Sequence, residues 1–166
     1  MDAFLSIVSK RDTRRFAGRA VEADVRGRIL QAGRLAGSAR NRQPWRFVVI
    51  ESREAKDRIA ETVYVPGNLT GADFGIAIVG PAGLDAGRCA QNMMLAAWND
   101  GVASCPNGMP EAARTAEALG LGEGEQPAVV LSFGYPATGR TAEKRSVDDW
   151  IAQADRKPLD ELVSRI

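Results

Sequence analysis

The sequence predicts an α/β or α+β domain built around a central sheet, because helical and strand-like segments alternate along it. Apolar residues recur at helical spacing in several segments, and short apolar runs typical of buried strands lie between them. With 166 residues and no internal repeat, the chain is long enough for one domain with a sizeable core. We therefore expect a single domain over residues 1–166.

Helices are expected where apolar residues recur three or four positions apart. The pattern is clearest in residues 84–100, where Cys89, Met93 and Ala97 belong to a broad apolar stripe. Gly101 suits the left-handed conformation of a helix C-cap. The other predicted helices are residues 2–9, 22–36, 53–63 and 111–119.

Strands are expected in the apolar runs 46–51, 74–79 and 128–133, with a shorter one at 102–105. Pro44 ends any helix before the first run, and Gly80-Pro81 ends the second. The segment Pro106-Asn107-Gly108 is predicted to be a turn. The tail from Gly139 onward is polar, and no element is predicted there.

The composition is that of an ordinary globular protein, with 45% hydrophobic and 26% charged residues. Lys and Arg number 22 against 21 Asp and Glu, so the net charge of +1 gives no global bias toward nucleic acid. No apolar run approaches the roughly 20 residues that span a bilayer, and no signal-type segment is seen. We expect a cytoplasmic location, without nucleic acid or membrane partners.

Histidine is absent from the chain. This excludes Ser-His-Asp and Cys-His nucleophilic machinery and nearly all zinc and iron sites, and no metal site is predicted. Cys89 and Cys105 lie too far apart for a metal-binding motif and are expected to be buried thiols. If the chain is an enzyme, we expect a bound cofactor to carry the reactive chemistry.

The densest cluster of positive charge is Lys-Arg-Asp-Thr-Arg-Arg-Phe at residues 10–16. In a nearly neutral chain, such a cluster suits one discrete anion, such as a phosphate bound by guanidinium forks. The alternative is a solvated basic face that pairs with acidic residues of later helices.

The polar loop at residues 37–43 offers Ser38, Asn41 and Gln43 for hydrogen bonds to the edge of a heterocycle. The alternative there is a helix C-cap followed by a turn. No Rossmann glycine pattern and no P-loop pattern is present, so neither type of nucleotide site is indicated.

Six motifs, taken in order, form a specific set. They are Lys-Arg-Asp-Thr-Arg-Arg-Phe at 10–16, Ala-Gly-Ser-Ala-Arg-Asn-Arg-Gln-Pro-Trp-Arg-Phe at 36–47, Asp-Ala-Gly-Arg-Cys-Ala-Gln-Asn-Met-Met-Leu-Ala-Ala at 85–97, Gly-Val-Ala-Ser-Cys-Pro at 101–106, Phe-Gly-Tyr-Pro at 133–136 and Arg-Lys-Pro-Leu-Asp-Glu-Leu-Val at 156–163. Together they resemble the FMN-dependent nitroreductase family. The resemblance implies an α+β, nitroreductase-like fold with a central, mostly antiparallel sheet wrapped by helices. It also implies an intertwined homodimer with FMN at the interface, in which the helix at 84–100 packs against its partner as well as its own core.

The resemblance assigns FMN contacts residue by residue. The matching residues are Lys10, Arg11, Asp12, Arg14, Ser38, Asn41, Asn68, Pro106, Asn107, Gly108, Arg156 and Lys157. The first four match the surroundings of the phosphate and ribityl chain, and the loop at 38–41 matches a segment that the other subunit lays along the isoalloxazine. Asn68 matches a residue near the pyrimidine edge, and the backbone amides of 106–108 match donors that face N5 and O4. Arg156 is favoured over Lys144-Arg145 as the second part of the phosphate clamp.

The resemblance implies an NAD(P)H-dependent FMN oxidoreductase of the nitroreductase type. A hydride from NADH or NADPH would pass through flavin N5 to a nitroaromatic, quinone or similar acceptor, with ping-pong kinetics. The little sequence between the strand at 74–79 and the helix at 84–100 suggests an open flavin face.

Three alternatives stay open at this stage. The chain could be a flavin-binding or storage module, or a protein that binds another phosphorylated ligand. It could also be an enzyme like the dimethylbenzimidazole synthases, which fragment flavin, with Asp12 as acid or base. For Asp12 we favour the simpler role of accepting hydrogen bonds from the ribityl hydroxyls.

Overall fold

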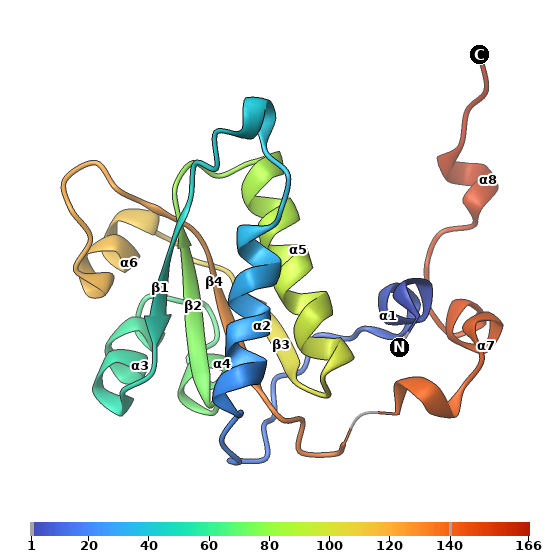
Figure 1. The fold of residues 1–166 in the computed structure, drawn as a ribbon, viewed down its shortest axis with the longest axis horizontal. Helices are drawn as coiled ribbons and strands as arrows, with labels where there is room; N and C mark the ends of the chain where they lie inside the picture. Colours follow the sequence, from blue (N-terminus) through green and yellow to red (C-terminus); the bar gives the residue numbers. More distant parts are fainter. Residues whose placement is uncertain (1, 140) are drawn as a thin grey trace. The chain divides into compact units, whose positions relative to one another are not determined.

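The computed structural model describes residues 2–139 and 141–166 (Figure 1). The chain forms two compact units. The larger comprises residues 11–140, and the smaller combines residues 1–10 with residues 141–166. The sheet and most of the apolar core belong to the larger unit.

Four antiparallel strands form the sheet, in the order β1-β2-β4-β3 (Figure 1). Their bounds are β1 Arg46–Ile50, β2 Phe74–Val79, β3 Ala103–Asn107 and β4 Pro127–Gly134. The predicted α+β fold with an antiparallel central sheet is confirmed. The predicted turn at 106–108 is wrong for its first two residues, because β3 continues through Pro106 and Asn107. Proline is tolerated there because β3 is an edge strand of the sheet.

Helices cover both faces of the sheet (Figure 1). On one face lie α2 (Ala23–Arg34) and α5 (Leu84–Asn99), and on the other lie α3 (Arg53–Ala60), α4 (Gly67–Thr70) and α6 (Ala112–Leu119). Apart from α4, for which no helix was predicted, they match the predicted helices to within three residues. No helix within the described residues is long and apolar enough to cross a membrane.

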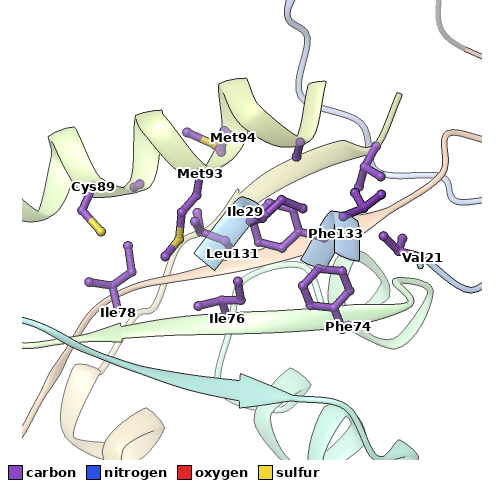
Figure 2. Packing of buried hydrophobic residues seen from close by; sticks show 14 of the residues in the cluster. Val21, Ile29, Phe74, Ile76, Ile78, Cys89, Met93, Met94, Leu131 and Phe133 are labelled. Atoms are coloured by element: carbon purple, nitrogen blue, oxygen red, sulfur yellow. The ribbon is translucent and has the colours of Figure 1, made fainter. Parts of the chain in front are cut away.

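Side chains along a strand point alternately to opposite faces of the sheet, so they pack into two separate apolar cores. Ile76 and Leu131 join Ile29 of α2 and Met93 of α5 in the first core (Figure 2). Ala77 and its neighbours pack with α3 and α4 in the second. Helices therefore cover both faces of the sheet. Because β2 is buried on both faces, its sequence is one continuous apolar run.

Helix α5 buries its apolar stripe within its own chain. The stripe residues in the first core are Cys89, Ala90, Met93, Met94 and Ala97 (Figure 2). Gly33 of α2 permits this close packing, since a Cβ at Gly33 would lie 2.1 Å from Cε of Met93. Residues 88, 91 and 92 are exposed. The intrachain core accounts for these five stripe residues without a partner subunit.

The smaller unit contains α1 (Ala3–Ser9), the short 3-10 helix η2 (Ala142–Lys144), α7 (Val147–Ala152) and α8 (Leu159–Leu162). The predicted helix at 2–9 is confirmed apart from its first residue, Asp2, which is the N-cap and accepts the Phe4 N–H at 2.9 Å. Helix α7 begins with a capping box between Ser146 and Asp149. Trp150 is buried and donates to the Ala142 carbonyl at 2.9 Å. The polar tail therefore contains elements that its composition did not predict.

A charge network ties the segment before α2 to the start of β2. Asp73 Oδ2 accepts the Val21 N–H at 2.8 Å and an Arg26 N–H at 2.7 Å. Arg26 Nε also donates to the Val21 carbonyl at 3.0 Å, and its guanidinium lies 4.8 Å from the centroid of the Phe74 ring. Both charged side chains are only about a fifth exposed, at 22% and 19%. Arg26 also pairs with Glu51 at 2.8 Å, but that carboxylate is 63% exposed, so Asp73 is the less solvated of its two partners.

We predict that Asp73→Ala lowers the free energy of unfolding by about 2 kcal/mol, because it leaves the Val21 amide without its acceptor and leaves Arg26 with the more exposed Glu51 as its ionic partner. Urea denaturation followed by circular dichroism measures this. The matched control is Asp57→Ala, which breaks an exposed pair with Arg53 at 2.7 Å and should cost less than about 0.5 kcal/mol. Equal losses in the two variants would contradict the account.

Candidate functional site

Part of the basic cluster lies along the β3–β4 end of the sheet. Asp12 forms a parallel bridge with Ser104 of β3, and Phe16 forms an antiparallel bridge with Pro136, just after β4. The backbone hydrogen bonds of this segment are Thr13 N–H to the Ser104 carbonyl at 3.1 Å, Ala17 N–H to the Tyr135 carbonyl at 2.8 Å, and Ala137 N–H to the Arg15 carbonyl at 3.1 Å. Residues 11–17 are therefore held as an extension of the sheet.

Gly134 allows the close approach of this segment. A Cβ at Gly134 would lie 2.9 Å from Cδ1 of Phe16 and 3.3 Å from the backbone nitrogen of Asp73. Both contacts are too close for a side chain unless its neighbours shift. Glycine in the Phe-Gly-Tyr-Pro motif therefore has a packing role, since it admits the Phe16 ring.

The next residue, Tyr135, fixes the far end of the segment. Its hydroxyl donates to Glu22, and Arg19 donates to the same carboxylate at 2.6 Å. The Arg19 guanidinium also lies 4.1 Å from the centroid of the Tyr135 ring. The hydrogen bond from Tyr135 and, to a smaller extent, the one from Arg19 lower the pKa of Glu22 to about 2. Glu22 is thus ionised at neutral pH.

Buried polar side chains meet on the β3 strand, on the face that carries α4. Nδ2 of Asn68, in α4, donates a hydrogen bond to Sγ of Cys105 at 3.7 Å. Asn107 Nδ2 donates to Ser132 Oγ at 2.7 Å and to the Val130 carbonyl at 3.2 Å. The structure thus brings Asn68 beside β3. The predicted segment 106–108 consists of the last two residues of β3 and of Gly108.

Two buried oxygens on β3 have no hydrogen-bond partner among the described residues: Ser104 Oγ and Asn107 Oδ1. Leaving a buried acceptor unsatisfied costs about 1–3 kcal/mol. Such atoms in a folded protein call for an explanation, such as a water or ligand that completes their bonding. Ser104 is bridged to Asp12 and Asn107 precedes Gly108, so both oxygens belong to the strand that the basic segment borders.

Gly108 lies against the ring of Tyr64, a residue that the sequence analysis missed. Tyr64 N–H donates to the Gly108 carbonyl at 3.0 Å, and a Cβ at Gly108 would lie 2.9 Å from Cδ2 of Tyr64. The Tyr64 side chain is nevertheless 71% exposed. Of the three residues predicted to offer amides, Pro106 has no N–H to give, so only Asn107 and Gly108 can do so.

The other predicted contacts of the larger unit, Ser38 and Asn41, lie at the opposite end of α2. Residues 11–17 precede the N-terminus of this helix, whereas residues 38–41 follow its C-terminus (Figure 1). Its 12 residues span about 18 Å at 1.5 Å per residue. One chain therefore does not bring the loop at 38–41 next to Arg11 and Arg14.

This loop is shaped by its own side chains. Ser38 Oγ accepts the Gln43 N–H at 2.8 Å, and Asn41 Oδ1 accepts from Gln43 Nε2 at 3.2 Å. Arg40, Asn41 and Gln43 all have left-handed backbone angles, with φ of 54°, 53° and 48°. Three non-glycine residues in this region within four positions are uncommon, and such strain clusters at functional sites.

The remaining basic candidates belong to the smaller unit. Lys10 is the C-cap of α1. Arg145 donates to Gln153 Oε1 at 2.6 Å and lies 4.9 Å from the Trp150 ring centroid. Arg156 donates to the backbone carbonyls of residues 154 and 155, at 3.2 and 3.1 Å. Lys144 ends η2, and Lys157 follows Arg156. The choice of phosphate clamp between these pairs stays a prediction.

Both cysteines are buried, as predicted. Burial raises the pKa of the Cys89 thiol to about 11, because the thiolate would lose its solvation. Cys89 is therefore protonated at neutral pH and has an inert, structural thiol.

The fold and the polar strand define an α+β protein with a candidate ligand site at a sheet edge. Residues 7–67 and 82–135 match the model of the nitroreductase family. The chain is 30% identical over 144 residues to an Archaeoglobus fulgidus protein named "Putative NADH dehydrogenase/NAD(P)H nitroreductase", covering 78% of this chain and 83% of that one. The chain belongs to the nitroreductase family.

Solved structures agree with this assignment. One is a "putative nitroreductase in complex with fmn" from Desulfovibrio desulfuricans, with a TM-score of 0.82, 26% identity, and coverage of 100% of this chain and 97% of that one. Another is a "Putative NADH dehydrogenase/NAD(P)H nitroreductase" from Bacteroides thetaiotaomicron, with a TM-score of 0.76, 28% identity, and coverage of 85% and 92%. The nitroreductase fold expected from the sequence is confirmed.

Proposed function

We propose that this chain is an FMN-dependent oxidoreductase that uses NADH or NADPH to reduce a nitroaromatic, quinone or similar acceptor, with ping-pong kinetics. When bound, FMN supplies the hydride chemistry at N5, which suits a chain without histidine. The observation that carries the proposal is the bridge between Asp12 and Ser104. It joins the basic segment to β3, which ends at Asn107 and is followed by Gly108.

The residues on this edge fit the parts of FMN. Arg11 and Arg14 would bind the phosphate and the lower ribityl chain through charge-assisted hydrogen bonds. Asp12 would accept from ribityl hydroxyls. Asn107 Oδ1, on the sheet face that carries Asn68, is an acceptor suited to a hydroxyl or ring N–H donor, whereas Ser104 Oγ belongs to the opposite face because side chains alternate along a strand.

The other end of the site would hold the flavin ring. Asn68 would lie near its pyrimidine edge, and the backbone at Asn107 and Gly108 would stabilise negative charge on the reduced ring. Tyr64, which lies on Gly108 and is exposed, would border the space open to the acceptor.

A homodimer would complete the site. Ser38 and Asn41 would reach the FMN of a second copy, which is supported by their separation from residues 11–17 by the length of α2. Exposed apolar side chains in the smaller unit would also gain cover from a partner. They include Leu159, Leu162, Val163 and Ile166.

For the second half of the phosphate clamp we propose Arg156, with Lys157 beside it and Lys10 from the end of α1. The competing pair is Lys144-Arg145. Arg145 is held by the Gln153 side chain and the Trp150 ring, whereas Arg156 donates to backbone carbonyls one and two positions before it, which favours Arg156.

We predict that the purified protein is yellow and that excess NADPH or NADH bleaches its flavin absorption band under anaerobic conditions. Adding a nitroaromatic or quinone should restore the band. A coloured protein that neither nucleotide bleaches would instead be a flavin-binding module. Consumption of the flavin itself, lost in Asp12→Asn, would point to the flavin-fragmenting alternative, and a protein that takes up no FMN would refute every flavin-based function.

We also predict that Arg11→Ala and Arg156→Ala each weaken FMN binding by about tenfold or more, because each removes a charge-assisted hydrogen bond to the phosphate. Fluorescence titration of the apoprotein with FMN measures this. Arg53→Ala, which removes an exposed charge on α3, is the matched control and should bind FMN normally. If Arg156→Ala binds normally while Lys144→Ala does not, the assigned clamp is wrong.

A further inference from the structure

A second group of arginines surrounds the loop between α2 and β1. Residues 34–46 contain four of them and no carboxylate: Arg34, Arg40, Arg42 and Arg46. Arg88 of α5 lies against the same loop, because a Cβ at Gly37 would lie 2.4 Å from its Nη2 atom. Such a concentration of cations is notable in a chain whose net charge is +1.

Two of the five have partners that explain their position. Arg46 forms a bidentate pair with Glu125, with both hydrogen bonds at 2.6 Å, and this pair lowers the pKa of Glu125 to about 2. Arg34 donates to the neutral amide of Gln31 at 2.6 Å. These two side chains are therefore structural.

The other three arginines differ. Within the part of the chain that the structure describes, neither Arg40, Arg42 nor Arg88 forms an ion pair. Asp85 lies beside the loop, and its carboxylate accepts the Ala39 N–H at 3.2 Å. Arg40, Arg42 and Arg88 are all exposed, so they are available to an anion from solution.

The backbone presents two of these charges on either side of Asn41. Arg40 has φ 54° and ψ 27°, a conformation that costs an L-residue free energy. The hydrogen bonds from Gln43 to Ser38 and Asn41 hold the turn in this shape. The loop therefore presents two exposed arginines, two positions apart in the chain, on a backbone conformation that costs free energy, which suits a role in binding an anion.

We propose that Arg40 and Arg42, assisted by Arg88, bind the 2′-phosphate of NADPH and make this protein prefer NADPH to NADH. The proposal rests on the proposed function, in which Asn41 lies along the flavin of a second copy. If a nicotinamide stacks on that flavin, the residues that flank Asn41 would be near enough to bind the rest of the dinucleotide. The 2′-phosphate is the group that distinguishes the two nucleotides, and guanidinium forks match its oxygens.

The kinetic test compares kcat/KM for NADPH and NADH in the FMN-loaded protein. Wild type should favour NADPH by about tenfold or more, and Arg40→Ala and Arg42→Ala should each lower kcat/KM for NADPH by about tenfold. The values for NADH should stay within about twofold. Arg53→Ala, with the same charge change on α3, should alter neither. Equal losses with both nucleotides, or no NADPH preference in wild type, would overturn the proposal.

A binding test does not depend on turnover. Calorimetry compares adenosine 2′,5′-bisphosphate with adenosine 5′-diphosphate, which carry two phosphates each but differ in the 2′ position. The first should bind about tenfold more tightly, and the Arg40→Ala/Arg42→Ala double variant should lose this difference. Equal affinities of the wild type for the two nucleotides would refute the proposal. A double variant that loses FMN but still binds adenosine 2′,5′-bisphosphate more tightly would also refute it. A protein that takes up no FMN but still selects the 2′-phosphate would refute the proposed function alone.

Discussion

The proposed site depends on the pairing of residues 11–17 with the β3–β4 end of the sheet. Three backbone hydrogen bonds and two bridges bring a segment near the start of the chain beside residues about 90 to 120 positions later. Gly134 makes room for it, and the network of Asp73 and Arg26 fixes the chain between this segment and α2. Without this pairing, the basic cluster would have no defined relation to β3, which ends at Asn107 just before Gly108.

The two apolar cores fix the position of the strands with which residues 11–17 pair. Because helices pack on both faces of the sheet, β3 is held in position even though it is an edge strand. A rigid edge can keep buried oxygens such as Ser104 Oγ and Asn107 Oδ1 unsatisfied, at a cost that core packing offsets. The same rigidity suits a site whose side chains must bind and orient a cofactor, while the cofactor supplies the reaction.

Sequence patterns predicted the elements that a local signal defines. The apolar run at 74–79 gave the bounds of β2 correctly, and the stripe of α5 gave that helix to within one residue. Pro106 was wrongly predicted to begin a turn, because proline usually ends a strand; it is allowed in an edge strand, and only the sheet order shows that β3 is one. Helix α7 was missed in a polar tail, although its Ser146-x-x-Asp149 capping box was a readable signal. Tyr64 gave no signal, because its role depends on where Gly108 lies. Likewise, the charge pattern marked residues 10–16 but did not indicate which strand they would meet.

Amide hydrogen exchange of the apoprotein and of the protein with FMN tests the central claim most directly. The account predicts that FMN slows exchange in residues 11–17 and 103–108 together, while exchange in α3, which packs on the sheet away from this edge, is unchanged. Protection of residues 103–108 with free exchange in 11–17 would contradict it, and so would protection confined to other parts of the chain.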